Sequence, residues 1–224
     1  MVNKTKNGIV WIRTPKCATS TLFEHLSNYA DNFSIPYTER MSHDVFPPKK
    51  YINLGHLWAG EVNWDVVRNE KRAVISSVRH PLDRFLSHYK HNLNLGRYNQ
   101  YGNDVSSFYL ENYHNTHFER YFRGMDNYLC KYLDVGNDDG FDKDIIMARY
   151  DFITVAEYLK ESLIKFENIV GYKFQNKDLI LNSTEYNLII SDEFLDLFNK
   201  NNKSDLELYQ FVLKHYNYKL QSNE

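Results

Sequence analysis

Little glycine, few cysteines and no long apolar run characterise this sequence, and each shortage excludes a class of protein. No glycine occurs between Gly8 and Gly55, so the Gly-x-x-x-x-Gly-Lys-Ser/Thr loop that holds ATP or GTP is missing there. The two cysteines, Cys17 and Cys130, cannot form the disulfide framework of a small secreted domain. No stretch approaches the roughly 18 consecutive apolar residues of a membrane-spanning helix, and residues 1–7 lack the apolar core of a signal peptide. We therefore expect a cytoplasmic chain without a membrane span.

An excess of charge of one sign is also missing. The formal net charge is −2, which argues against a general nucleic-acid-binding surface, so any basic patch should be local to a binding cleft. Apolar residues make up 42% of the chain and charged residues 25%, as in ordinary globular domains, and 224 residues suffice for one substantial core. We expect a single domain over residues 1–224. The abundance of Asn, Lys and Tyr suggests a microbial or viral source.

An anion-binding loop is predicted between an apolar strand at residues 8–12 and a helix that follows it. Lys16 supplies a positive charge, and three consecutive hydroxyl residues at 19–21 supply side-chain donors. The first turn of a helix also presents backbone N–H groups without intrahelical partners, and the helix dipole favours an anion at the same place. The pattern therefore favours phosphate binding, with a plain helix cap as the alternative.

A second strand–turn–helix unit is predicted at residues 73–89. Its apolar run, residues 73–78, is typical of a buried parallel strand. Arg79 then stands at the carboxyl end of that strand, where open α/β sheets bind their ligands, and Ser87 follows about one turn into the helix. This arginine and this hydroxyl would suit a second phosphate. The alternative is that Arg79 pairs with Asp83 and that Ser87 faces solvent.

Together the two units resemble the nucleotide-binding elements of sulfotransferases that use 3′-phosphoadenosine 5′-phosphosulfate (PAPS). The resemblance implies that Arg79 and Ser87, eight residues apart, hold the 3′-phosphate. It also implies that the nucleotide product is adenosine 3′,5′-bisphosphate (PAP) and that no metal ion is required. The loop residues that would hold the 5′-phosphosulfate are Lys16, Cys17, Ala18, Thr19 and Ser20.

Within that family, the closest likeness is to the heparan sulfate and uronyl 2-O-sulfotransferase branch. Residues 51–56 resemble the branch's Gly-His segment, which implies that His56 is the catalytic base. Residues 152–159 resemble its late strand–helix unit, and residues 181–185 resemble the loop that closes over the nucleotide. The likeness favours a glycan alcohol as the acceptor, ahead of a tyrosine phenol or a small-molecule alcohol. The closing loop would contact the nucleotide through Ser183 and Thr184.

Two positions depart from the family's pattern. Cys17 stands where the loop usually has a threonine, which removes one hydroxyl but leaves the backbone N–H group available. Because an anion-binding loop is electropositive, we expect Cys17 to be a free thiol with a lowered pKa. Leu54 stands where the branch commonly has a second histidine, so only His56 can act as the base in this segment.

Sulfuryl transfer needs a base for the acceptor hydroxyl and a cation beside the leaving phosphate. A histidine that titrates near neutrality suits the first role, and Lys16 suits the second. His56 is the candidate base because Gly55 before it permits close approach of the backbone. The plainer interpretation is a histidine that only caps a loop. The rival bases among the nine histidines are His43, His80 and His88.

The order of these motifs predicts an α/β fold, a single domain with a central, mostly parallel sheet flanked by helices, of the P-loop-like sulfotransferase type. A loop containing prolines is expected after the first helix. An acceptor-side insert of short helices and loops is placed at about residues 94–126, although its tyrosines could simply pack as a satellite of the core. Strands are expected near 8–12, 51–54 and 73–78, a helix over 82–94, and nucleotide-binding elements at about 9–30, 73–94 and 180–187.

Two rival functions stay open on sequence grounds. One is a nucleoside or small-molecule kinase, which would use ATP with magnesium, and the missing glycines and the absence of an evident acidic Walker-B strand end weigh against it. The other is a non-catalytic nucleotide-binding module that kept the fold. The presence of Lys16, Arg79 and His56 weighs against such a loss of activity.

Overall fold

The central sheet consists of five parallel strands. In this computed structural model, which describes residues 7–38, 51–54, 56–94, 107–108, 125–179 and 189–218, the strands lie in the order β2-β3-β1-β4-β6. The predicted α/β architecture with a mostly parallel sheet is confirmed. A separate parallel pair consists of β5 (Ser107–Phe108) and β7 (Ile189–Ile190). The strands of the main sheet are β1 (Gly8–Ile12), β2 (Tyr37–Thr38), β3 (Tyr51–Asn53), β4 (Ala73–Val78) and β6 (Phe152–Val155).

Hydrophobic layers cover both faces of this sheet. All residues of β1 and β4 are buried, as their largely apolar sequences predict for parallel strands enclosed on both sides. Because successive side chains of a strand point to opposite faces, Ile9 and Trp11 belong to one layer and Val10 and Ile12 to the other. The core therefore has two halves, separated by the sheet.

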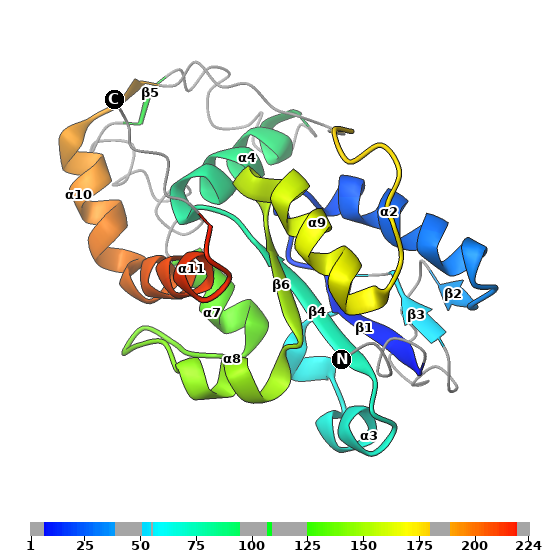
Figure 1. Cartoon of the computed structure of the whole chain (residues 1–224). Coiled ribbons are helices and arrows are strands. Elements are labelled where there is room, and N and C mark those ends of the chain that lie inside the picture. The colour runs from blue at the N-terminus through cyan, green and yellow to red at the C-terminus, as the bar shows by residue number, and fades with distance from the viewer. Residues whose placement is uncertain are drawn as a thin grey trace.

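Helices complete the two layers (Figure 1). The first layer contains α2 (Thr19–Asn32) and α9 (Leu159–Val170), and the second contains α3 (Trp64–Asn69), α7 (Tyr128–Leu133), α8 (Lys143–Arg149) and α11 (Lys203–His215). Within the described residues, no helix is long and apolar enough to cross a membrane. The remaining helical elements are η1 (Ala59–Glu61), α4 (Pro81–Asn94), η3 (Ala156–Tyr158) and α10 (Asp192–Asn201).

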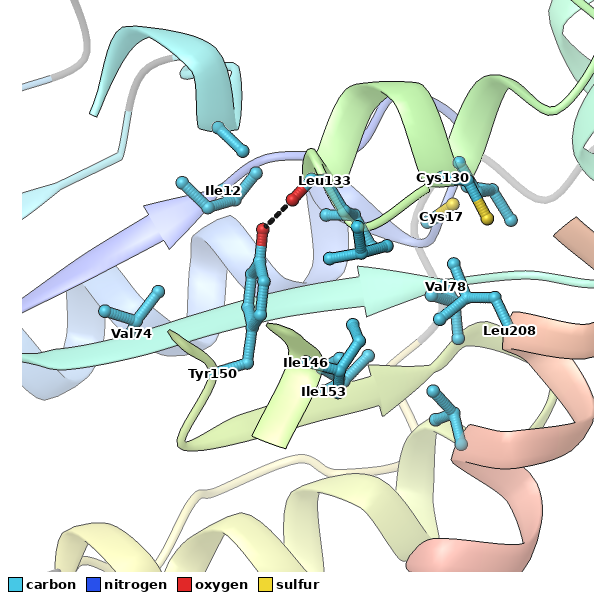
Figure 2. Packing of buried hydrophobic residues seen from close by; sticks show 14 of the residues in the cluster. Ile12, Cys17, Val74, Val78, Cys130, Leu133, Ile146, Tyr150, Ile153 and Leu208 are labelled. Atoms are coloured by element: carbon cyan, nitrogen blue, oxygen red, sulfur yellow. Dashed lines mark hydrogen bonds between the residues drawn. The ribbon is translucent and has the colours of Figure 1, made fainter. Parts of the chain in front are cut away.

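Two polar contacts hold α7 in the second layer, which Figure 2 shows from close by. The hydroxyl of Tyr150 donates a hydrogen bond of 2.7 Å to the carbonyl oxygen of Leu133 at the end of α7. At the other end, the buried carboxylate of Asp205 on α11 accepts hydrogen bonds of 2.8 Å from the backbone N–H groups of Leu129 and Cys130. Asp205 thereby pairs the donors that the first turn of a helix leaves open. α7 is thus fixed relative to the sheet, and its side chains reach the loop after β1.

The order of strands identifies where a ligand would bind. From β1 the chain passes to β2 and β3 on one side, and then returns to place β4 and β6 on the other side. The carboxyl ends of β1 and β4 therefore flank the point where the direction of winding reverses. Open α/β sheets bind ligands at this switch point, because the loops on either side run in opposite directions.

Most of the predicted elements match the structure. β1 and β4 have the predicted bounds, β3 covers residues 51–53, and α4 begins one residue before the predicted 82–94. The loop expected after α2 is wrong in part, because Tyr37 and Thr38 form the edge strand β2 directly after Pro36. Residues 95–106, 109–124 and 180–188 lie outside the described part, and so do most of the predicted insert and the whole nucleotide-closing loop.

Candidate functional site

The loop between β1 and α2 has an unusual backbone. Lys16 and Ala18 have φ angles of 67° and 57°, in the left-handed region that non-glycine residues rarely adopt. Ala18 is the N-cap residue of α2, and no side chain caps this helix end. Strained backbone of this kind is commonly found at functional sites. The first turn of α2 therefore opens towards the switch point without a capping side chain of its own. Thr19 and Ser20, the first two residues of α2, are half-buried.

Hydrogen bonds tie the start of this loop to β4. The hydroxyl of Ser76 donates to the carbonyl oxygen of Ile12 at 2.8 Å, and it also lies 3.1 Å from the hydroxyl of Thr14. All three residues are fully buried. The start of the loop is therefore fixed to the strand that carries Arg79 at its end.

Lys16 and Arg79, which the sequence assigns to two separate phosphate groups, lie next to each other here. The Nη1 atom of Arg79 donates to the carbonyl oxygen of Lys16 at 3.4 Å. Burial and the neighbouring charge of Arg79 lower the pKa of Lys16. A lysine near an arginine is electrostatically unfavourable unless an anion lies between or beside them. The site thus concentrates positive charge at the N-terminus of α2, where the helix dipole adds to it.

An acidic residue, Glu157, positions Arg79 and the start of α4. Its Oε1 atom accepts a 2.8 Å hydrogen bond from the backbone N–H of His80 and lies 4.0 Å from Nε of Arg79. Burial raises the pKa of this carboxyl group. Glu157 lies in the stretch 152–159 that the family resemblance covers, but no pattern in the sequence indicates its contact with Arg79.

Ser87 lies in the second turn of α4 with 5% of its surface exposed. The alternative in which Ser87 faces solvent is therefore wrong. Its assignment to the 3′-phosphate stays a prediction. Ser183 and Thr184, assigned to the closing loop, lie outside the described residues.

Cys17 does not have the environment predicted from the sequence. Its thiol is fully buried in the layer that contains α7, and Figure 2 shows it beside Val78 and Cys130. Burial raises its pKa to about 12, because a thiolate would lose its hydration there. The nearby charge of Arg84 opposes this effect without overcoming it. The expectation of a lowered pKa is wrong, and only the backbone of Cys17 can contribute to anion binding.

His56 lies on the other side of the loop, next to Arg13. Its side chain is exposed at the surface and makes a hydrogen bond to the backbone of Arg13. Partial loss of hydration, followed by the charge of Arg13, lowers the pKa of the imidazole. The neutral form, which can accept a proton, is therefore favoured near neutral pH. Gly55 lies outside the described residues, so its proposed role in close approach stays a prediction.

The rival histidines are placed differently. The backbone N–H of His80 is bonded to Glu157, and its ring meets the ring of Tyr209 edge-on at 5.4 Å. The ring of His88 lies 6.5 Å from that of Tyr128. His43 lies outside the described residues. The contact of His56 with the loop after β1 sets it apart from His80 and His88.

Two aromatic residues near His56 carried no signal in the sequence. The hydroxyl of Tyr132 on α7 donates to the carbonyl oxygen of Arg13 at 3.1 Å, although 119 positions separate them. The indole N–H of Trp58 donates to the carbonyl oxygen of Lys131 at 3.0 Å. Both contacts join segments distant in the chain, so they depend on the tertiary fold. They place α7 against both the anion loop and the segment that carries His56.

Comparisons with protein families and with solved structures both give matches. A family model described as the sulfotransferase family matches residues 1–212. Among solved structures, the chain is similar to mouse sulfotransferase SULT7A1 complexed with PAP, with a TM-score of 0.46 and 16% sequence identity over 96% of this chain and 85% of that chain. A comparison with curated proteins gives no match.

Proposed function

The chain belongs to the sulfotransferase family, and we propose that it transfers a sulfuryl group from PAPS to an acceptor hydroxyl and releases PAP. The observation that carries this proposal is the convergence of Lys16 and Arg79 at the uncapped start of α2. Two cations and a helix N-terminus at the switch point of an open sheet fit a ligand with more than one anionic group. PAPS carries such groups at both its 3′ and 5′ positions.

The proposed roles follow from position. Lys16, in the strained loop, would lie beside the 5′-phosphosulfate, with backbone N–H groups of residues 17–20 around it. Arg79 and Ser87, which follow β4, would hold the 3′-phosphate. Ser183 and Thr184 would close over the nucleotide. The hydrogen bond from Arg79 to Lys16 supports this arrangement because it holds the two proposed phosphate-binding elements next to each other.

In the reaction, His56 would accept the proton of the acceptor hydroxyl as the acceptor oxygen forms a bond to sulfur. The bond between sulfur and the bridging phosphate oxygen breaks, and the electron pair stays on that oxygen. The ammonium group of Lys16 would stabilise the charge that develops there. The lowered pKa of His56 supports the role of a base, because the imidazole is already neutral at physiological pH.

The acceptor that we propose is a glycan. The exposure of His56 supports an acceptor that reaches the base from the open surface rather than from an enclosed cavity. The similarity of residues 51–56 to the 2-O-sulfotransferase branch agrees with this choice.

Thermal unfolding with different nucleotides tests the proposed donor. A ligand that binds only the folded chain raises the melting temperature, by an amount that grows with its concentration relative to Kd. PAP should stabilise the chain strongly, and ATP with magnesium should stabilise it little. Stronger stabilisation by ATP with magnesium would instead indicate a kinase, and no stabilisation by PAP would contradict the proposal.

A further inference from the structure

Trp58 is an exposed aromatic residue that is nevertheless held in place. Its side chain is 48% exposed. The indole N–H is bonded to the carbonyl oxygen of Lys131, and the backbone N–H of Trp58 donates to the carboxylate of Glu61 at 3.1 Å. The edge of the indole ring is therefore fixed by a hydrogen bond while about half of the side chain stays accessible to another molecule.

Gly60 leaves the space next to the indole ring without a side chain. A side-chain carbon built on Gly60 would lie 3.5–3.6 Å from three carbons of the ring, and Gly60 itself is exposed. The hydrogen bond of the indole N–H to Lys131 anchors the edge of the ring on α7. The ring therefore presents a flat, accessible apolar surface in a fixed position.

This surface lies on the same side of the chain as His56. Residues 56–59 alternate between exposed and buried, with His56 and Trp58 exposed and Leu57 and Ala59 buried. Trp58 itself has an extended backbone, with φ −93° and ψ 143°. In extended chain, side chains two residues apart point to the same side, about 7 Å apart.

Contacts made by α7 also indicate that the side chains of His56 and Trp58 lie near each other. Tyr132 donates to the carbonyl oxygen of Arg13, to whose backbone His56 is also bonded. Lys131, the residue before Tyr132, accepts the hydrogen bond of Trp58. His56, Trp58 and Tyr132 thus lie around the loop after β1. His56 follows β3 and Arg79 follows β4, and these two strands pair with β1 on its opposite sides.

We propose that the exposed indole surface of Trp58 is an acceptor-binding surface on which a pyranose ring of a glycan stacks, one sugar unit from the hydroxyl presented to His56. This inference rests on the proposed sulfuryl transfer. A pyranose has a flat face of C–H groups that packs on an aromatic ring, while hydroxyls at its rim remain in water. A half-exposed indole offers that contact. A small phenol would need a more enclosed apolar pocket to bury its ring.

Steady-state kinetics of Trp58→Ala and Trp58→Phe test the surface. The alanine variant should raise the KM for an oligosaccharide acceptor about 10- to 100-fold, the scale of losing one aromatic stacking partner, with little change in kcat at saturating acceptor or in PAP binding. The phenylalanine variant should recover most of the loss. Phe33→Ala is the matched control, since Phe33 is 49% exposed but lies at the opposite end of α2 from the loop. It should leave KM unchanged.

Tryptophan fluorescence gives a second readout that needs no turnover. Trp11 is fully buried and Trp64 is half-buried, so the emission of Trp58 should respond to an added ligand most strongly. The probes are hexasaccharides of cellulose, unsulfated chondroitin and unsulfated heparosan, and a tyrosine-containing peptide, each added with PAP. At least one hexasaccharide should change the emission of the wild type, and Trp58→Phe should abolish that change.

The two proposals fail in different ways. If PAP does not raise the melting temperature, the proposed function fails, whatever the sugars do. If PAP stabilises the chain but no hexasaccharide changes the emission, or if Trp58→Ala sulfates its acceptor with the wild-type KM, the stacking surface is wrong. A response to the tyrosine peptide alone would also overturn it, because the occupant would then be a polypeptide.

Discussion

The Nη1 atom of Arg79 donates a hydrogen bond of 3.4 Å to the carbonyl oxygen of Lys16, and this contact joins the ends of two neighbouring strands. Lys16 follows β1 and Arg79 follows β4. Because the strands are parallel and adjacent, their carboxyl ends meet at the same edge of the sheet. Although the two residues are adjacent, we expect different effects from their substitution: loss of Arg79 should mainly weaken PAP binding, and loss of Lys16 should mainly lower kcat.

Replacing Arg79 by alanine should weaken PAP binding by about 2–3 kcal/mol, the usual scale for a charge-assisted hydrogen bond and the phosphate left without its partner. The wild type should bind PAP far more tightly than adenosine 5′-monophosphate, which lacks the 3′-phosphate. Titration calorimetry of both nucleotides measures the difference. Arg68→Ala is the control, because Arg68 is an exposed arginine on α3. Equal affinity of the wild type for the two nucleotides would contradict the assignment of Arg79.

Lys16→Ala should lower kcat far more than it weakens PAP binding. The ammonium group is assigned to charge that appears only as the sulfur–oxygen bond breaks, so its loss acts mainly on the transition state. The comparison needs kcat, KM and the Kd for PAP of the same variant. A change confined to KM would show instead that Lys16 only holds the ground-state phosphate.

The thiols of Cys17 and Cys130 should be unreactive in the folded chain. Burial raises the pKa of both, that of Cys17 to about 12, and neither has exposed surface. At about pH 8 a thiol reagent should therefore label no cysteine in the native chain and two after denaturation. Rapid labelling of Cys17 under native conditions would mean that the loop opens or that the thiol faces the anion site.

The pH dependence of kcat/KM should report His56. Only the neutral imidazole accepts a proton, so activity rises with pH as His56 loses its own proton. Because burial and Arg13 lower its pKa, the midpoint should lie below the ordinary value of 6.5. His56→Ala should abolish this ionisation, while His43→Ala should retain it. A wild-type midpoint above 6.5 would contradict the environment described for His56.

The sequence predicts the fold well where its signal is local. The largely apolar sequences of β1 and β4 have few interpretations, and both strands have the predicted bounds. β2 was missed because it has only two residues and directly follows a proline, so neither length nor alternation indicates it. Its pairing with β3 is a property of the assembled sheet.

The same distinction between local sequence signals and contacts that depend on the tertiary fold applies to the site. The proximity of Lys16 and Arg79 agrees with local signals in the sequence. Arg79 directly follows β4, Lys16 lies in the loop after β1, and parallel strands bring their carboxyl ends together. The contacts of Trp58 and Tyr132 were not predictable from the sequence, since their hydrogen-bond partners lie 73 and 119 positions away. The direction of the pKa shift of Cys17 was predicted wrongly, because residue type and position in a loop do not reveal which way a side chain points.

The most direct test of sulfuryl transfer is the transfer of sulfur-35 from labelled PAPS to the hexasaccharides by the wild type and by His56→Ala, with PAP binding measured for both. The wild type should label at least one acceptor. His56→Ala should lose on the order of 10²–10⁴-fold in kcat, the contribution of general base catalysis, while it still binds PAP. Absence of transfer by a wild type that binds PAP would contradict the catalytic account for these acceptors, and near-normal turnover by His56→Ala would exclude His56 as the base.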